Sequence, residues 1–533
     1  MSSVPSVVKA LLTIQMVRSE TMQSSGENPE ATAAGIAIPG KARIPSHFWM
    51  YGTWALLAAG LMLYSQTWAF TDDEGFHLLA ALLIKGGMRP YLDFCFPQTP
   101  FNAYWNAFWM GVFGESWRTA HVLAALETSA AVVLAAQFVY ARLEERPWRI
   151  AGAIAATAMI GLSANLVEFG PLGQPYGMCL FTTVCAFRLA VAAVARRTCW
   201  LAGAAGALAG TAAASSLLAA TVAPVLMIWV GWRNRAGSRW TKAAAFAAGA
   251  AVPFLPLLRL YLESPSVVWF NVAQYHLYYR VVYWSEPLSH DLETLTGWTL
   301  DPQSLLLGLL ALFGVVYIAR RSDWSPERRA EFYLCGWLAL GMTAELAFTH
   351  PTFPRYFCLL APFVGILAVP GLYALGSRVL SPERPFWPVL IISAISAAVL
   401  ARALYENRNL STWPEYEGIA RRLVEVTPPG KPVFTEEGFY FVMKRRPPPG
   451  MEFGYSHKLD LPPARLAALH ITTESQLKSQ LAAGVFAGAA SCDNDFVDTY
   501  SLEKTFTHKD DRHNCSIFWD WNPRAAESEK PSP

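Results

Sequence analysis

Long apolar runs without charge alternate with short polar segments over most of the chain. The run from Phe48 to Phe70 is long enough to cross about 30 Å of hydrocarbon at about 1.5 Å per residue. Two short runs between Trp200 and Trp232 are predicted to meet near Ser215. With the other runs they predict about 11 transmembrane helices. The others lie near 120–141, 150–167, 176–194, 243–262, 304–318, a segment ending at 348, a segment ending at 378, and 386–404.

Basic residues cluster at alternate ends of these runs. Lys41 and Arg43 precede the first one, and Arg196, Arg233 and Arg328 lie in loops that the count places on the same side. Because cytoplasmic loops are enriched in Lys and Arg, we expect the N-terminus inside and the loop after Phe70 outside. Residues 1–46 lack a long apolar core and are predicted to be a disordered cytoplasmic tail.

Composition agrees with a polytopic α-helical membrane protein. Of the 533 residues, 53% are apolar and 15% are charged, which excludes a soluble globular protein. A net charge of +2 without a basic stripe gives no indication of a nucleic-acid partner. Eight cysteines without metal-ligand spacing argue against a zinc site, and no nucleotide-binding loop is present. We therefore expect no cofactor, and nothing indicates a divalent metal.

The composition changes after Tyr405. Residues 47–405 form the predicted transmembrane domain, whereas 406–533 are polar and Pro-rich, with short mixed segments typical of a small α/β domain. The eleventh span places this domain outside the membrane. Cys492 and Cys515 both lie in it, so a disulfide is predicted there, with two free buried thiols as the alternative.

The first outer loop, 71–118, carries two apolar segments that are too short to span a membrane. One is Leu78–Ile84, and the other is the aromatic segment Pro97–Phe113. Both are predicted to be interfacial helices that lie along the membrane surface.

Three consecutive acids, Asp72, Asp73 and Glu74, open this loop where the chain leaves the membrane. One interpretation is that they only cap the following helix, because acids in a first turn favour the helix dipole. Three carboxylates side by side also raise the pKa of one of them and can prepare a general base. We therefore predict a catalytic site here.

Further polar residues lie in the outer loops and are predicted to converge on a cleft at the boundary between water and membrane. They are His77, Lys85, Arg89, Asp93, Gln98, Glu168, Gln174, His276, Arg280, Glu286, His350, Arg355 and Tyr356.

The segment from Asp73 to His77, followed by Gly86, Pro90-Tyr91, Asp93 and Pro97-Gln98-Thr99-Pro100, resembles the first outer loop of GT-C glycosyltransferases. The resemblance is to protein mannosyltransferases, lipid A aminoarabinose transferases and rhizobial lipopolysaccharide sugar transferases. His350, Arg355-Tyr356 and Pro362 are similar to a late motif of that family. The likeness covers about 48–404.

This resemblance implies an enzyme that moves a sugar from a polyprenyl-phosphate donor to a glycan, lipid or protein acceptor, with inversion. The reaction takes place at the outer, periplasmic face of the bacterial cytoplasmic membrane. Asp73 falls on the family's base, which removes the proton of the acceptor hydroxyl. Lys85, Arg89 and Arg355 are the candidates for binding the phosphate of the leaving group.

The sequence departs from the family pattern at two places. Gly75 and Phe76 stand where aminoarabinose transferases carry a basic residue, and Gln174 and Tyr176 stand where many members have an Asp. Both departures concern the donor sugar and the phosphate contacts.

The alternative to a transferase is a transporter or flippase of lipid-linked sugars. Alternating access favours inverted repeats and broken helices in matching halves. The sequence shows no such repeat, and its acids lie in an outer loop. A structural membrane scaffold leaves the three acids unexplained.

Overall fold

The computed structural model describes residues 46–144, 146–233, 238–285, 289–379 and 384–523. The chain divides into two units, 1–45 and 46–533, and everything below concerns the second. The predicted cytoplasmic tail therefore lies outside the described residues, apart from its last position. The division at residue 405 stays a prediction.

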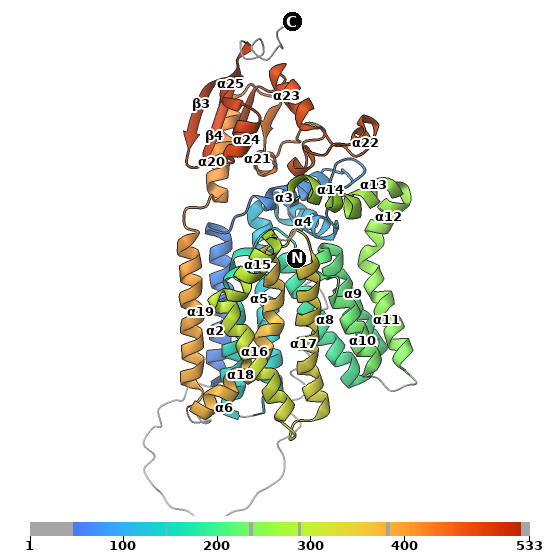
Figure 1. Ribbon diagram of the computed structural model, residues 1–533, viewed down its shortest axis with the longest axis vertical. Helices are drawn as coiled ribbons and strands as arrows, with labels where there is room; N and C mark the ends of the chain where they lie inside the picture. Colours follow the sequence, from blue (N-terminus) through green and yellow to red (C-terminus); the bar gives the residue numbers. More distant parts are fainter. Residues whose placement is uncertain (1–45, 145, 234–237, 286–288, 380–383, 524–533) are drawn as a thin grey trace, which may run out of the picture. The chain divides into compact units, whose positions relative to one another are not determined.

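Long helices run side by side through most of this unit (Figure 1). They are α2 (Ser46–Thr67), α5 (Trp117–Arg142), α6 (Arg146–Gly161), α8 (Tyr176–Arg196), α9 (Cys199–Ser215), α10 (Val222–Trp232), α11 (Arg239–Ala251), α16 (Pro302–Arg320), α17 (Pro326–Phe348), α18 (Ala361–Val379) and α19 (Phe386–Glu406).

Six helical segments among the described residues are long and apolar enough to cross a membrane. They are Trp117–Arg142, Tyr176–Arg196, Arg239–Glu263, Pro302–Arg320, Pro354–Val379 and Phe386–Glu406. The predicted break near Ser215 is confirmed, because α9 ends there and the chain continues in η1 (Leu217–Ala219) and α10. A polytopic membrane fold is thus supported, and the count of eleven spans stays a prediction.

Close helix packing depends on small residues. A Cβ at Gly206 would lie 2.0 Å from the carbonyl oxygen of Phe246, and a Cβ at Gly371 would lie 1.9 Å from that of Leu310. These contacts join α9 to α11 and α18 to α16, so the backbones touch where the sequence is rich in Gly and Ala.

Two expectations differ from the structure. The helix predicted over 150–167 is broken between α6 and α7 (Ala164–Phe169). The segment 263–303, expected as a loop, contains α13 (Pro265–Trp269), η3 (Phe270–Gln274), α14 (Tyr275–Tyr283) and α15 (Ser289–Leu300), whereas α12 (Leu255–Glu263) belongs to the span predicted over 243–262. Residues spaced by four share a helix face, and the rings of Tyr275, Tyr279 and Tyr283 pack in that order along α14.

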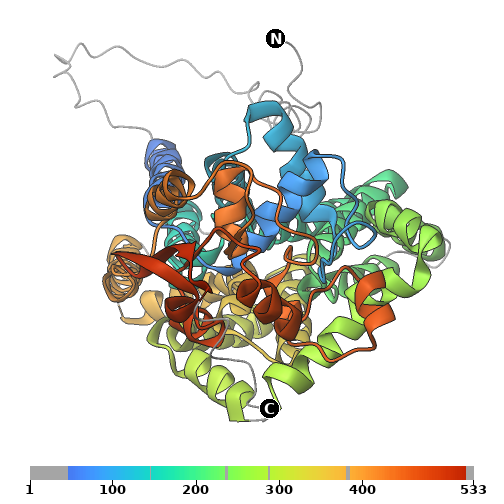
Figure 2. The same ribbon diagram turned by 90° about the horizontal axis from the view of Figure 1, so that it is seen from above.

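The two short helices predicted for the first outer loop are present as α3 (Asp73–Lys85) and α4 (Phe101–Phe113). Most of α3 is buried, from Glu74 to Ala81 without interruption. It lies between the long helices and the C-terminal segments (Figure 1), and the view from above shows the orange and red C-terminal segments on the side facing the viewer (Figure 2). The helix is therefore enclosed by protein on both sides.

The C-terminal segments form the predicted small α/β fold. A four-stranded sheet has the order β1 (Val433–Thr435), β2 (Gly488–Ser491), β4 (Cys515–Trp521) and β3 (Phe506–Arg512). β1 is parallel to β2, with Val433 opposite Gly488, and β4 is antiparallel to both β2 and β3. The accompanying helices are α20 (Trp413–Val426), α21 (Glu437–Met443), α22 (Pro463–Ala468), α23 (Glu474–Ala482), α24 (Asn494–Thr499) and α25 (Leu502–Thr505).

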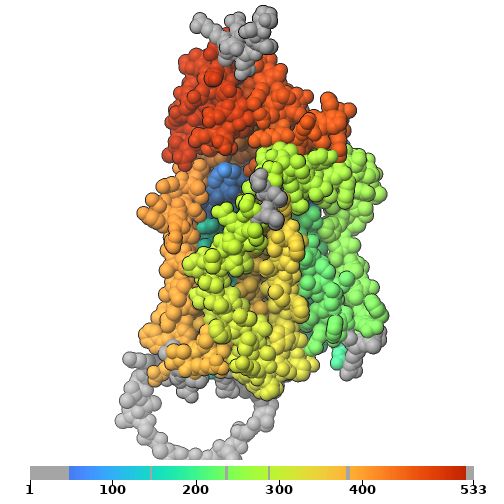
Figure 3. Space-filling view, viewed as in Figure 1, coloured from blue at the N-terminus to red at the C-terminus, as the bar shows by residue number. Residues whose placement is uncertain are grey.

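One apolar core joins the C-terminal segments to the first outer loop. Phe76 and Leu78 of α3 share it with Trp413, Tyr416 and Phe453. The space-filling view shows the C-terminal segments in contact with the green helices that follow α11 (Figure 3). This shared core holds α3, and hence its acids, against residues distant in sequence.

Candidate active site

The three acids diverge because successive residues of a helix point about 100° apart. Asp72 stands at the N-cap position of α3 but makes no capping hydrogen bond with its side chain. Asp73 and Glu74 form the first turn. Capping alone therefore does not account for the three acids, and each has its own surroundings.

Asp73 faces a cavity of about 620 Å³. Its carboxylate lies 2.6 Å from Nη2 of Arg355 and accepts a hydrogen bond of 3.2 Å from the Tyr455 hydroxyl. Both members of the ion pair are mostly buried, with side-chain exposures of 19% for Asp73 and 25% for Arg355. The pair lines one wall of the cavity with oppositely charged groups.

Glu74 is completely buried. It accepts hydrogen bonds from the backbone N–H of Gly173 and from Nε1 of Trp413 (2.9 Å), and it lies 2.7 Å from Nε2 of His121. These partners come from α5, the loop before α8, and α20. Glu74 thus ties α3 to three other segments and does not line the cavity that Asp73 faces.

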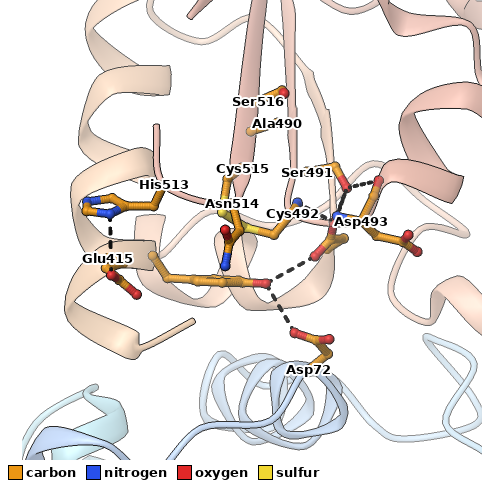
Figure 4. Close-up of a disulfide and its surroundings, with 12 residues drawn as sticks. Asp72, Glu415, Ala490, Ser491, Cys492, Asp493, His513, Asn514, Cys515 and Ser516 are labelled. Carbon is orange, nitrogen blue, oxygen red and sulfur yellow. Dashed lines mark hydrogen bonds and ion pairs between the residues drawn. A yellow bond between two sulfur atoms is a disulfide. The ribbon is translucent and has the colours of Figure 1, made fainter. Parts of the chain in front are cut away.

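Asp72 faces a second cavity, of about 230 Å³, between α3 and the C-terminal segments. Its carboxylate accepts a hydrogen bond of 3.3 Å from the Tyr416 hydroxyl, which also lies 3.4 Å from Glu436. Burial raises the pKa of Asp72 and raises that of Glu436 to about 7. Figure 4 shows Asp72 extending from its helix toward the segment that carries Cys492 and Asp493.

The predicted disulfide between Cys492 and Cys515 is present beside this second cavity (Figure 4). It joins the residue after β2 to the first residue of β4. The backbone N–H of Cys492 donates a hydrogen bond of 3.2 Å to Glu436. The disulfide therefore holds a segment that contacts one of the buried acids.

Five of the predicted site residues line the larger cavity: Asp73, Gln98, His350, Arg355 and Tyr356. Nδ1 of His350 lies 2.6 Å from Asp291, so that ring is fixed by a neighbouring carboxylate. His276 and Arg280 of α14 also line this cavity, and Glu286 lies outside the described residues. Residues from three separate regions of the chain thus line one cavity.

The other predicted cations lie elsewhere. Lys85 is paired with Glu115 at 2.6 Å, and Arg89 is paired with Asp93 and Glu263, each at 3.0 Å. Arg89 holds the pKa of Asp93 below its usual value. These pairs lie in exposed positions outside both cavities.

The remaining predicted residues are also outside the two cavities. The ring of His77 is buried against Phe76 and Phe96, and burial lowers its pKa to about 3, so it is neutral. Glu168 accepts a hydrogen bond of 2.9 Å from Asn407, and Gln174 is buried.

One departure from the family pattern has a steric reason. A Cβ at Gly75 would lie 2.8 Å from the backbone nitrogen of Gly438. The start of α3 therefore touches the start of α21 at two glycines, and no side chain fits between them. A basic residue at position 75 is incompatible with this contact.

Sequence reasoning missed several residues of the larger cavity. Tyr455 comes from the C-terminal segments, and no motif marked it. The row Tyr275, Tyr279 and Tyr283 had a signal in its spacing of four, which is that of a helix face. Thr99 lines the same cavity, is 4% exposed, and its hydroxyl has no hydrogen-bond partner among the described residues.

Among the described residues no group of three or more His, Cys, Asp or Glu side chains is placed to hold a metal ion. That no cofactor is needed stays a prediction.

Known structures share this fold. No protein-family model matches the chain, and no curated protein matches it in sequence. The crystal structure of ArnT from Cupriavidus metallidurans in the apo state superposes with a TM-score of 0.61 at 14% identity, over 92% of this chain and 100% of ArnT. ArnT bound to undecaprenyl phosphate gives 0.59 at 15% identity, over 89% and 98%.

The Archaeoglobus fulgidus oligosaccharyltransferase in complex with Zn and sulfate gives a TM-score of 0.50 at 13% identity, over 86% of this chain and 71% of that one. These structural neighbours are GT-C glycosyltransferases, as the first-loop motif predicted. The described chain therefore has the fold of the GT-C membrane glycosyltransferases.

Proposed function

We propose that this protein is a membrane glycosyltransferase that moves a sugar from a polyprenyl-phosphate donor to an acceptor hydroxyl. One observation carries the proposal: Asp73, the predicted base, and Arg355, one of the predicted phosphate ligands, are paired on the wall of the larger cavity. The fold shared with ArnT, one structure of which holds undecaprenyl phosphate, supports the choice of donor.

The donor phosphate binds at the cationic side of the larger cavity. Arg355 and Arg280 both line it, and Nε of Arg280 has no hydrogen-bond partner among the described residues. A guanidinium matches phosphate geometry and stabilises the negative charge that develops on the leaving group. Arg355 is the main phosphate ligand, and Lys85 and Arg89, which lie outside the cavity, are no longer proposed for this role.

Asp73 acts as the general base. Its carboxylate is paired with Arg355. A phosphate that binds Arg355 competes with this pair and frees the carboxylate for the acceptor proton. Attack on the anomeric carbon from the side opposite the phosphate then inverts its configuration.

The acceptor approaches from the smaller cavity. Phe76, Tyr283 and Tyr455 line both cavities and form the wall between them. The Tyr455 hydroxyl reaches across to Asp73. An acceptor hydroxyl that displaces Tyr455 from Asp73 is placed beside the base.

The proposed location is the bacterial cytoplasmic membrane, with Asp73 and the C-terminal segments on the periplasmic side. The positive-inside distribution of Lys and Arg supports this orientation. The proposed acceptor is a hydroxyl group of a glycan, a lipid or a protein.

A transfer assay with a polyprenyl-phosphate sugar and purified protein tests the proposal. Asp73→Asn preserves volume and is expected to lower kcat by about 100- to 10,000-fold, the usual contribution of a general base. Glu115→Gln is the matched control, because Glu115 is an acid of the same loop paired with Lys85 outside both cavities. Turnover of Asp73→Asn near that of the control would refute the assignment of the base.

A further inference from the structure

A separate pocket lies between α5 and α8, far along α8 from the acids. α8 starts at Tyr176, close to Gly173, whose backbone N–H donates a hydrogen bond to Glu74, and it ends at Arg196. The pocket has a volume of about 190 Å³ and is lined near that far end by Arg142, Arg188 and Arg196. It therefore belongs to the end of the helix bundle opposite the candidate active site.

The charges around this pocket do not balance among the described residues. Glu331 of α17 is bonded to Arg142 through both of its oxygens. Arg188 makes no ion pair in the described part of the chain. Its Nη1 donates a hydrogen bond of 2.7 Å to the carbonyl oxygen of Leu134. Of the three arginines that line the pocket, only Arg142 thus has an ion pair with a carboxylate among the described residues.

Two of the cations lie close together in apolar surroundings. The guanidinium carbons of Arg142 and Arg188 are 5.8 and 6.0 Å from the centre of the Phe138 ring. Val191 and Ala192 form another part of the lining. An unbalanced charge inside a membrane-spanning segment is costly and calls for a partner. An anion with an apolar portion fits both the charge and the walls.

Phosphate is the anion whose geometry a guanidinium fits best, since two parallel N–H groups meet two oxygens. Basic pockets between transmembrane helices are typical sites for lipid headgroups. Arg188 lies eight positions before Arg196, about 12 Å along the helix, which is within reach of a headgroup at the membrane surface.

We propose that Arg188 and Arg196, with Arg142, form a binding site for a phosphate-bearing anion, supplied by the headgroup of an anionic phospholipid. The site is distinct from the cavity that Asp73 faces and does not depend on the proposed sugar transfer. Inorganic phosphate shares the chemistry and is the other source to be distinguished.

The test uses full-length protein and native mass spectrometry after exchange into phosphatidylglycerol or phosphatidylcholine. Phosphatidylglycerol is expected to stay bound, and Arg188→Gln to weaken its retention by about tenfold, the effect of losing one charge-assisted hydrogen bond. Arg196→Gln changes an exposed residue and tests the same site if Arg188→Gln does not fold. Arg378→Gln, an exposed arginine in the last turn of α18, is the matched control.

Displacement of phosphatidylglycerol by inorganic phosphate at comparable concentration would support the phosphate site and overturn the lipid as its source. Equal retention of the two lipids, or equal retention of phosphatidylglycerol by the wild type and both pocket variants, would overturn the site itself.

Discussion

Substitutions of Asp73 and Arg355 are expected to have different effects on donor binding. If the donor phosphate takes Arg355 away from Asp73, the carboxylate competes with the donor for the same guanidinium. Asp73→Asn should then leave donor binding unchanged or make it tighter while turnover falls. Arg355→Gln should weaken donor binding and slow turnover, because it removes the phosphate contact itself.

The magnitudes follow from the geometry. The contact of 2.6 Å between Arg355 and Asp73 is a charge-assisted hydrogen bond, and a phosphate that takes the place of Asp73 makes a bond of the same kind with Arg355. Such a bond to a charged group contributes about 1.5 to 3 kcal/mol, which corresponds to about a 10- to 100-fold change in Kd. We therefore expect Arg355→Gln to raise the donor Kd by that factor.

Donor binding is measured without turnover, by titrating purified variants with a polyprenyl-phosphate sugar in the absence of acceptor. Turnover is measured separately with both substrates at saturation. Arg89→Gln is the control for loss of an arginine, since Arg89 is paired at the surface with Asp93 and Glu263. Its donor Kd should stay within about twofold of the wild-type value, as is usual for surface substitutions.

The reasoning fails if Asp73→Asn weakens donor binding as much as Arg355→Gln does. That result would mean that the carboxylate helps to bind the donor and does not compete with it. If Arg89→Gln weakens donor binding as much as Arg355→Gln does, the surface cations bind the donor phosphate.

Three further predictions concern the contact between α3 and the C-terminal segments. Cys492→Ser and Cys515→Ser should each lower the free energy of unfolding by up to about 3 kcal/mol, the usual value for a disulfide that closes a loop of this size. If alkylation of unreduced, denatured wild-type protein finds two free thiols at these positions, the disulfide is absent. Gly75→Ala should lower the free energy of unfolding by about 1 to 3 kcal/mol, because the new Cβ meets the backbone of Gly438. Gly111→Ala is the control, because a Cβ there meets nothing within 4 Å. Equal melting temperatures of the two variants would disprove the contact. Burial raises the pKa of Glu436 from 4.5 to about 7, so the folded state binds this proton more tightly than the unfolded chain does. The free energy of unfolding should therefore fall as the pH rises from 4.5 to 7. Glu436→Gln should reduce this pH dependence in thermal melts, and an unchanged dependence would contradict the pKa shift.

Much of the site could be predicted from local sequence. Asp73, His350 and Arg355 were recognised because acids, a histidine and an arginine stand next to apolar runs, where polar groups mark a membrane face. Sidedness placed them at one membrane face, but it placed Lys85 and Arg89 there as well. These two cations, also predicted to bind the phosphate, lie outside the cavity. Both cations find carboxylates nearby, and a sequence does not show which charges are already paired.

The C-terminal contribution could not have been predicted. Tyr455, Trp413 and Tyr416 carry no motif, and each acts on one of the three acids only because a shared apolar core brings α3 against α20 and α21. The contact at Gly75 likewise exists only in the folded chain.

The sequence by itself determined the apolar runs, the two short helices of the first outer loop and the acidic motif, because each follows from local composition and spacing. Only the tertiary structure decided what each acid does. Adjacent residues of a helix point in different directions, so Asp73 faces the larger cavity, Glu74 is buried in the core, and Asp72 faces the smaller cavity. The partners that distinguish them come from distant parts of the chain, and packing alone brings them together.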